Sequence, residues 1–308
     1  MRDRVRIGTR GSQLALRQAE EVAAGLRRAW PRLEVELVPI RTSGDRLATA
    51  HLADVGGKGL FVQEIDEALR EGRVDLAVHS LKDLPAERPK GLVLAAFPRR
   101  EDPRDVLVAA TAMRVGSLPR GARVGTSSLR RSVQLLARRP DLDAVPIRGN
   151  VDTRLRKLRH GEYDALVLAA AGLRRLGLLD ATATPLDPEE MLPAAGQGTL
   201  GVEAREDDAE ILELAEALTD AETRTATLAE RAFLEAVGGT CTTPLAAYAR
   251  RTAAGLRLDA FVATPDGARV LRDGDVGDPG APQGLGRHVA ARLLAAGAAD
   301  IIEAGRVA

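Results

Sequence analysis

Strand-like and helix-like stretches alternate along the first two thirds of this chain, and no other feature of the sequence constrains the fold as strongly. Apolar residues at 5–8, 33–40 and 74–78 are typical of strands, whereas residues 14–28 and 60–70 have helical spacing. Ser12 stands where a helix N-cap is expected, and residues 41–55 read as a long polar loop. Because strands that alternate with helices usually pair in parallel, the pattern predicts an α/β fold with parallel strands.

The same pattern recurs farther along the chain. Residues 123–128 (RVGTSS) and a helix at 129–138 resemble residues 6–12 (RIGTRGS) and the helix that follows them. A helix at 155–159 and a strand at 163–167 resemble 60–70 and 74–78, and in both copies an aspartate stands three residues after a glycine. The repeat predicts two α/β domains of similar topology. A chance similarity between two strand–helix units is the alternative.

The last third has a different character. A helix is expected at 222–237, two strands at 256–263 and 268–272, and a final helix at 285–296 that ends at Gly297. The two strands are joined by Pro265-Asp266-Gly267, in which proline presets φ and glycine supplies a positive φ. This segment predicts a small C-terminal α+β domain.

Charge and composition exclude several classes of protein. The 44 basic and 44 acidic residues balance, which argues against a dedicated nucleic-acid binder. The single cysteine, Cys241, rules out an intramolecular disulfide and a cysteine-cluster metal site, and the four histidines lack metal-ligand spacing, so no metal is expected. No secretory signal is visible, and the longest apolar run, 165–173, is too short to span a bilayer. We therefore expect a cytoplasmic protein that binds neither membrane nor nucleic acid.

Three strand-to-helix junctions combine glycine, hydroxyl residues and arginine: residues 8–12 (GTRGS), 125–131 (GTSSLRR) and 148–154 (RGNVDTR). Helix N-termini present free N–H groups, and guanidinium forks match carboxylate and phosphate. Because open α/β sheets bind ligands at the carboxyl ends of their strands, the junctions together predict an anionic ligand. The alternative is that the hydroxyl residues are only N-caps and the arginines are only solvated.

Two further features can carry chemistry. Residues 79–85 (HSLKDLP) follow an expected strand, and their Lys82-Asp83 dipeptide is either a structural ion pair or a catalytic acid beside a cation. Cys241 follows Gly239-Thr240 in an expected loop, where it is either a buried small hydrophobe or a reactive thiol.

Taken together, these segments resemble the porphobilinogen deaminase (hydroxymethylbilane synthase) family. The matching stretches occur in family order and run from residue 5 into the C-terminal domain: IGTRGSQLAL, VGGKGLFVQEID, DLAVHSLKDLP, REDPRDVL, VGTSSLRR, IRGNVDTRL, LPAAGQGTLGVE and the loop at Cys241. HSLKDLP and GTSSLRR are the most specific of them.

The resemblance implies three domains. Residues 1–98 and 199–217 would form a discontinuous α/β domain 1, residues 104–192 an α/β domain 2, and residues 219–308 a C-terminal α+β domain that carries the cofactor cysteine. The first two would form a pair of the type II periplasmic-binding-protein kind, joined by crossover segments at 97–104 and 192–202.

The resemblance also implies a transferase of tetrapyrrole (haem) biosynthesis. Such an enzyme joins four porphobilinogen molecules head to tail, releases ammonia each time, builds on a dipyrromethane primer linked to a cysteine, and hydrolyses off linear hydroxymethylbilane. It would act as a cytoplasmic monomer. The alternative is a non-catalytic cytoplasmic anion-binding protein of the same two-domain fold, but that reading leaves Cys241 in an appended domain without a role.

Residue roles carried over by motif are expectations of the same kind. Each pyrrole ring bears an acetate and a propionate, and burying such charges unpaired is costly, so a set of arginines is required. Asp83 would be the catalytic residue. The expected cofactor-binding residues are Cys241 (through a thioether), Lys82, Thr126, Ser128, Arg130, Arg131 and Arg148. The expected substrate-binding residues are Arg10, Ser12, Arg148, Arg154 and Arg175.

The sequence departs from the family pattern in two places. Thr240 directly precedes Cys241 where relatives commonly have Gly-Gly or Ala-Gly, and threonine restricts φ in that loop. Asp54 and Gln63 stand where relatives often have lysine, which leaves open whether a basic residue acts in the loop before Gly56.

Overall fold

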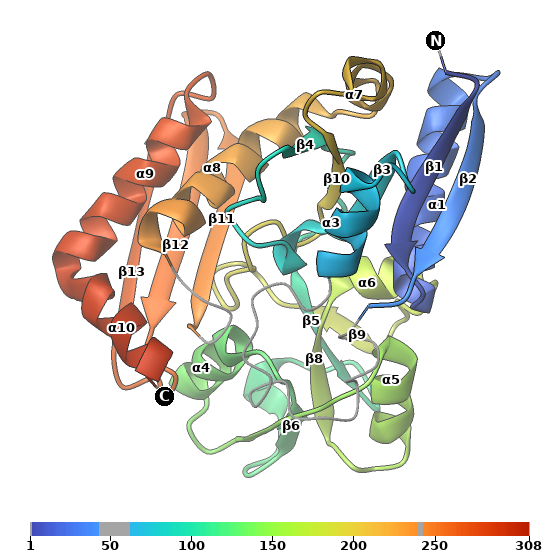
Figure 1. Ribbon diagram of the computed structural model, residues 1–308. Helices are drawn as coiled ribbons and strands as arrows, with labels where there is room; N and C mark the ends of the chain where they lie inside the picture. The colour runs from blue at the N-terminus through green and yellow to red at the C-terminus, as the bar shows by residue number, and fades with distance from the viewer. Residues whose placement is uncertain (1, 43–61, 239–242, 308) are drawn as a thin grey trace. The chain divides into compact units, whose positions relative to one another are not determined.

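The first five-stranded sheet confirms the expected α/β character of the N-terminal region and adds one antiparallel strand to it (Figure 1). β1 pairs in parallel with β2 and β3, whereas β10 runs antiparallel to both β3 and β4. The predicted parallel pairing is therefore confirmed for β1, β2 and β3, and the antiparallel strand β10, which comes from a distant part of the chain, was not predicted. In sheet order the strands are β2 (Glu34–Ile40), β1 (Arg4–Arg10), β3 (Leu76–Ser80), β10 (Leu200–Arg205) and β4 (Leu92–Ala96).

This computed structural model describes residues 2–42, 62–238 and 243–307. The chain forms two compact units, Met1–Glu101 with Gly198–Arg224 and Asp102–Gln197 with Thr225–Ala308. The first unit is discontinuous, as the expected domain 1 is. The expected domains 2 and 3 fall in one unit, and the three-domain boundaries stay a prediction.

Helix α1 (Gln13–Ala29) shows how the sequence builds the first unit. The Ser12 hydroxyl accepts a hydrogen bond from the Ala15 N–H at 3.3 Å, which confirms the predicted N-cap. Ala19, Val22 and Leu26 are buried at helical spacing and pack in the core that also contains the inward side chains of β1. The other helices of this unit are α3 (Gln63–Arg70) and α7 (Ala209–Glu216).

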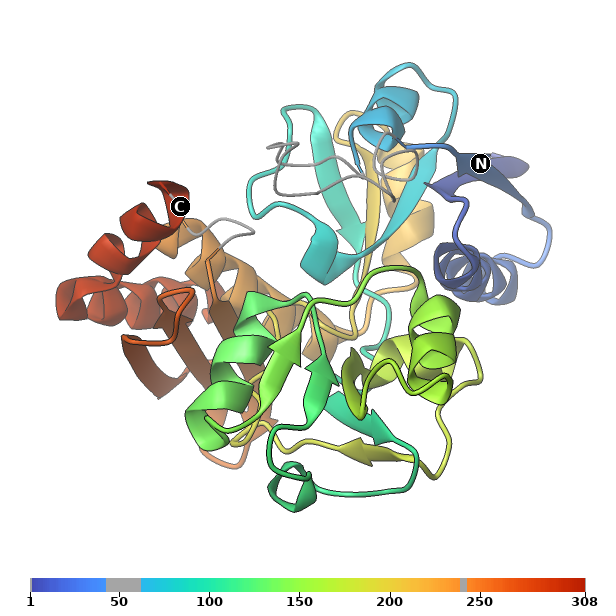
Figure 2. The same cartoon turned by 90° about the horizontal axis from the view of Figure 1, so that it is seen from below.

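The second sheet repeats the topology of the first. Its strands, blue-green to yellow in Figure 2, have the order β7 (Asp143–Val145), β6 (Arg123–Gly125), β8 (Ala165–Ala169), β5 (Asp105–Ala109) and β9 (Ala183–Pro185). β6 is parallel to β7 and β8, and β5 is antiparallel to β8 and β9. The helices are α4 (Leu129–Arg138), α5 (Val151–Arg159) and α6 (Ala170–Arg175).

The two repeated aspartates have the same structural role in the two sheets. Asp75 accepts the backbone N–H of Arg6 at 2.8 Å, and Asp164 accepts the backbone N–H of Arg123 at 2.6 Å. The backbone N–H of each aspartate donates in return to the carbonyl of the same arginine at 2.9 Å. The prediction of two similar α/β domains is therefore confirmed in detail.

The third sheet is antiparallel and belongs to the second unit. Its strands are β11 (Leu245–Thr252), β12 (Gly255–Ala263) and β13 (Val270–Gly277). One face packs against α8 (Ala221–Val237) and α9 (Pro282–Leu293) (Figure 1). On the other face Phe261 shares a small core with Val133 of α4. The α+β prediction is confirmed, although it missed β11, whose three alanines have low strand propensity.

Turns complete the fold. Gly267 has φ +71°, as the predicted Pro-Asp-Gly turn requires. Gly297 has φ +95°, outside the range of a right-handed helix, so the helix breaks there as predicted. A further helix that was not predicted, α10 (Ala299–Val307), follows this kink within Leu294–Ala298. Short 3₁₀ turns occupy Leu81–Asp83 and Val115–Ser117.

Candidate active site

Asp83 lies in a short turn at the carboxyl end of β3. Leu81 and Leu84 are buried together with Val62, and the Leu81 N–H donates to the carbonyl of Thr199 at 3.0 Å. These contacts fix the backbone of the 3₁₀ turn and leave the Lys82 and Asp83 side chains exposed. The sequence thus places a carboxylate and an ammonium at the carboxyl end of a central strand, which is where α/β folds bind ligands.

The Asp83 carboxylate takes part in no ion pair or hydrogen bond within the described parts of the chain. A structural ion pair between Lys82 and Asp83 is therefore not formed, and that alternative was wrong. A carboxylate held at a strand end without a partner is available to a ligand.

The junction at residues 8–12 is only partly consistent with an anion site. The Ser12 hydroxyl caps α1, as the plainer reading of this junction expected. Gln18 of the same helix donates a hydrogen bond from its Nε2 to the hydroxyl of Ser80 at 2.7 Å. Arg10, at the end of β1, is partly buried.

In the second unit, two consecutive arginines at the start of α4 meet one buried carboxylate. Arg130 Nη1 lies 2.8 Å from Asp105 Oδ2, and Arg131 Nη2 lies 2.8 Å from Asp105 Oδ1. Gln197 Nε2 donates to the same Oδ1 at 2.9 Å. Asp105 is fully buried, and Arg130 and Arg131 are 6% and 7% exposed. We call Asp105, Arg130 and Arg131 the Asp105 cluster.

Charge decides what the Asp105 cluster can do. Burial alone would raise the pKa of Asp105, but Arg130 and Arg131 lower it well below its usual value, so the carboxyl is ionised. One carboxylate between two guanidinium groups leaves one positive charge in excess. Burial lowers the pKa of Arg130, although Asp105 opposes that shift. A bound carboxylate or phosphate would supply the missing negative charge.

Arg154 extends this positive region. Burial and the like charge of Arg131 lower its pKa, and its Nε donates to the carbonyl of Gly149 at 2.7 Å. Gly149 has φ +105°, and a Cβ there would lie 2.7 Å from Thr153, so the turn before α5 requires glycine. Arg148 is exposed in the same turn.

The hydroxyl residues at the start of α4 differ in their roles. The Thr126 hydroxyl accepts the Ser128 N–H at 3.2 Å and is buried. Ser128 occupies the N-cap position of α4, but its side chain makes no capping hydrogen bond. A hydroxyl at a helix N-terminus that does not cap the helix can donate its O–H to a bound anion.

The structure brings together only some of the predicted residues. Arg10, Ser12, Lys82 and Asp83 belong to the first unit. The second unit contains Thr126, Ser128, Arg130, Arg131, Arg148, Arg154 and Arg175, the last partly buried at the end of α6. Cys241, Gly239, Thr240 and Asp54 lie outside the described residues, and Gln63 is the first residue of α3.

Sequence reasoning missed two buried carboxylates. Asp105 opens the apolar strand β5, and Glu203 lies inside the apolar strand β10. Both are fully buried. An acidic residue within an otherwise apolar strand is the signal that marks them, because such a charge must be paired.

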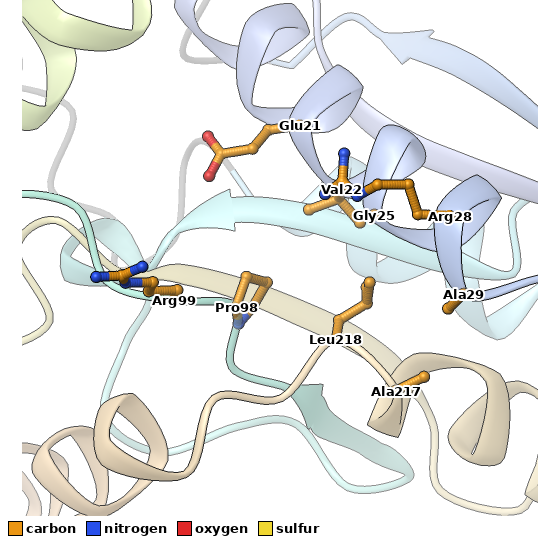
Figure 3. Close-up of a pocket in the computed structure, with 9 residues that line it drawn as sticks. All are labelled: Glu21, Val22, Gly25, Arg28, Ala29, Pro98, Arg99, Ala217 and Leu218. Carbon is orange, nitrogen blue, oxygen red and sulfur yellow. The ribbon is translucent and has the colours of Figure 1, made fainter.

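A separate pocket of about 480 Å³ lies in the first unit (Figure 3). It is lined by α1, by the start of the first predicted crossover segment and by the chain after α7: Glu21, Val22, Gly25, Arg28, Ala29, Pro98, Arg99, Ala217 and Leu218. None of the predicted site residues lines it. The strand-end groups, and not this pocket, are the candidate site.

Within the described residues, no helix has the length and apolar character needed to cross a membrane.

Comparison with known proteins agrees with the motifs. The family model for the porphobilinogen deaminase dipyromethane cofactor binding domain matches residues 5–213, and the model for the C-terminal domain of the same family matches residues 224–295. Porphobilinogen deaminase of Syntrophobacter fumaroxidans is 49% identical over 304 residues, covering 98% of both chains. That of Acidithiobacillus ferrooxidans is 52% identical over 299 residues, covering 97% of both.

Among solved structures, the methionine binding protein MetQ aligns with 69% of this chain and 88% of its own, at 16% identity and a TM-score of 0.44. A periplasmic substrate-binding protein of a Coxiella burnetii ABC transporter aligns with 70% of this chain and 91% of its own, at 16% identity and a TM-score of 0.44. The two family models and the full-length relatives decide the assignment: the chain belongs to the porphobilinogen deaminase family of transferases, and its first 200 or so residues include the domain that binds the dipyrromethane cofactor.

Proposed function

We propose that the chain joins four porphobilinogen molecules head to tail, with loss of ammonia at each addition, and releases linear hydroxymethylbilane. Its similarity to porphobilinogen deaminases over almost the whole length supports this reaction. The observation that carries the catalytic assignment is the exposed carboxylate of Asp83, which has no partner in the described chain. A protein that only bound anions would need the arginines but not this acid.

Asp83 would act on the substrate's aminomethyl group. The electrons of the pyrrole nitrogen break the bond to the amine, which leaves as ammonia, and the ring becomes an azafulvenium cation. A protonated Asp83 can deliver the proton that the leaving amine needs, and the resulting carboxylate then stabilises the cation. Lys82 beside it is a donor for a ring carboxylate.

The residues of the second unit fit a dipyrromethane group. Its acetate and propionate groups match the excess positive charge of the Asp105 cluster, with Arg148, Thr126 and Ser128 as further donors. When bound, the group supplies the primer to which the first pyrrole is joined. Cys241 would hold it through a thioether. Substrate carboxylates would be contacted by Arg10, Ser12, Arg148, Arg154 and Arg175. We further propose that the protein acts as a monomer in the cytoplasm.

The first test replaces Asp83. Asn keeps the size but has no negative charge and no transferable proton, so Asp83→Asn is expected to lose essentially all porphobilinogen consumption. Asp83→Glu moves the carboxylate by ~1 Å, which can cost about 10²-fold in rate. Both should melt like the unmodified protein, because the side chain is exposed. Substantial turnover by Asp83→Asn would end the assignment.

Glu87→Gln is the matched control, since Glu87 is an exposed carboxylate in the same segment. It should leave turnover unchanged.

The second test examines the cofactor. Intact-mass spectrometry of the purified protein should show an adduct of two pyrrole units that is absent from Cys241→Ser. An unmodified thiol in a protein that turns over porphobilinogen would contradict the role of Cys241.

A further inference from the structure

Glu203 of β10 is fully buried and contacts two basic side chains. Its Oε2 lies 3.1 Å from Nε2 of His79 on β3, close enough for an ion pair although not aligned as a hydrogen bond. Its Oε1 accepts a hydrogen bond from Arg88 Nε at 2.5 Å, and Arg88 Nη2 donates to Oε2 at 3.0 Å. Both carboxylate oxygens are therefore held.

The two basic residues flank the turn that carries Asp83. His79 is four residues before Asp83, and Arg88 is five residues after it. One carboxylate thus ties both ends of the segment 79–88. The pairing of β3 with β10 makes this possible, because Gly201 lies opposite His79 and Glu203 occupies the next position on the same face.

Glycine at 201 lets the turn pack closely on β10. A Cβ at this position would lie 3.0 Å from Leu81 and 3.1 Å from Leu84. These are the two buried side chains on either side of Lys82-Asp83. The strand that supplies Glu203 therefore also packs directly against the turn that carries Asp83.

Asp66 of α3 completes the network, which we call the Glu203 cluster: Asp66, His79, Arg88 and Glu203. Arg88 Nη2 donates to Asp66 Oδ1 at 2.8 Å, and the Arg88 side chain is only 9% exposed. Asp66, His79 and Glu203 lie close enough to hold a metal ion. Arg88 already bonds both carboxylates, however, so a guanidinium group supplies the positive charge that an ion would bring.

We propose that Glu203 is a positioning residue for the reaction: by binding His79 and Arg88 together, it fixes the segment that carries Asp83 and so sets where the catalytic carboxylate lies. This inference rests on the proposed role of Asp83. Displacing a catalytic group by ~1 Å can cost about 10²-fold in rate, so a loosened segment should be visible in kcat.

The test compares Glu203→Gln with Asp75→Asn. Asp75 is the matched control, because it is also buried, precedes the opposite end of β3, and forms ion pairs with Arg2 at 2.9 Å and Arg6 at 3.0 Å. Both variants should lower the melting temperature. Glu203→Gln should also lower kcat for porphobilinogen about 10- to 100-fold with little change in KM, whereas Asp75→Asn should keep kcat within about 2-fold.

A direct readout is amide hydrogen exchange at residues 81–84, measured below the melting temperature of each variant. Exchange should accelerate in Glu203→Gln and stay as in the unmodified protein in Asp75→Asn. If Glu203→Gln does not fold, Arg88→Met and Arg88→Lys replace it. The lysine variant keeps the charge and should recover a large part of the kcat lost in Arg88→Met.

Equal kcat in Glu203→Gln and Asp75→Asn, or equal loss in the two Arg88 variants, would overturn the positioning role. The failure of the proposed function gives a different result, since Asp83→Asn would then remain active. If Asp83→Asn is inactive while Glu203→Gln turns over normally, only the positioning role fails.

Discussion

Each five-stranded sheet has one antiparallel strand, and each of these strands buries a carboxylate that meets two basic side chains. In the first sheet Glu203 on β10 contacts His79 and Arg88. In the second sheet Asp105 on β5 contacts Arg130 and Arg131. Both carboxylates are fully buried. The two sheets share their topology. The two carboxylates differ in which elements supply their basic partners and in the net charge of the cluster around each of them.

The difference separates a cluster that binds a ligand from one that holds the backbone. The Asp105 cluster has two guanidinium groups for one carboxylate, so a positive charge is left for an anion. The Glu203 cluster has Asp66 as a second carboxylate. Arg88 and His79 therefore already contact carboxylates inside the cluster, and no positive charge is left over for an anion. We infer that a buried ion pair marks an anion site only where the positive charges outnumber the negative ones.

The largest expected effect comes from Asp105→Asn, which leaves two buried guanidinium groups facing a neutral amide. Removing one partner of a buried ion pair costs about 3–5 kcal/mol. The free energy of unfolding in urea should fall by that amount, and the cofactor adduct should be lost from the intact mass.

Asp259→Asn is the control for this variant, because Asp259 also pairs with two arginines, Arg250 and Arg257, but lies in the third sheet. It should keep the adduct. Retention of the adduct by Asp105→Asn would show that the arginines bind the cofactor without their buried counter-ion.

Arg131→Leu and Arg148→Leu test whether a buried and an exposed arginine both bind the cofactor, and whether only the buried one stabilises the fold. Both should reduce the cofactor adduct, because each removes a carboxylate contact, which for the buried Arg131 is worth roughly 2–5 kcal/mol. Only Arg131→Leu should also lower the melting temperature, since Arg131 is buried against Asp105 and Arg148 is exposed. The exposed Arg156 of α5 provides the control variant Arg156→Leu, which should change neither quantity. A full adduct in both test variants would remove these residues from the cofactor site.

Much of the fold could be predicted from the sequence, because its local signals are strong. Ser12 as a cap and the Pro-Asp-Gly turn at Gly267 each depend on neighbouring residues, and each was correct. The repeated spacing of Asp75 and Asp164 correctly indicated two similar domains, because each aspartate binds the equivalent arginine of its own sheet. The antiparallel strand β10 could not be predicted in this way. Its direction depends on pairing with β3 across more than a hundred residues of sequence.

The same division applies to the candidate site. The exposed Asp83 and the arginines of α4 could be named from motifs, because they stand at strand-to-helix junctions. Asp105 and Glu203 could not, since each is a single acidic residue in an apolar strand and its partners are set by the tertiary fold. Cys241 stays a prediction from sequence.

The smallest expected effect is in the response to acid, where the two clusters should differ in sign. The guanidinium groups lower the folded pKa of Asp105 despite its burial, so its stabilising contribution is present above the unfolded value of about 3.9 and is lost as the pH falls below it. Burial raises the folded pKa of Asp66, so its contribution is present at low pH and is lost as the pH rises through that folded value.

Urea unfolding between about pH 6 and pH 3 should therefore show opposite trends for two variants. Relative to Asp66→Asn, the unmodified protein should gain stability as the pH falls toward the unfolded pKa of about 3.9. Relative to Asp105→Asn, it should lose stability below about pH 4. Each difference should amount to about 1.4 kcal/mol per unit of pKa change. Parallel curves for the two variants would contradict the opposite electrostatics of the two clusters.

The position of β10 also determines the order in which the protein can fold during its synthesis. β10 lies between β3 and β4, yet it is translated about a hundred residues after β4. At ~5–20 residues per second, the ribosome needs roughly 5–20 seconds to bridge that interval. The β5–β9 sheet is complete at residue 185, before β10 begins at Leu200. We expect the second sheet to form before the first on the nascent chain. Chains stalled near residue 230 should already protect the second sheet from protease, whereas protection of the first sheet should require chains stalled near residue 260.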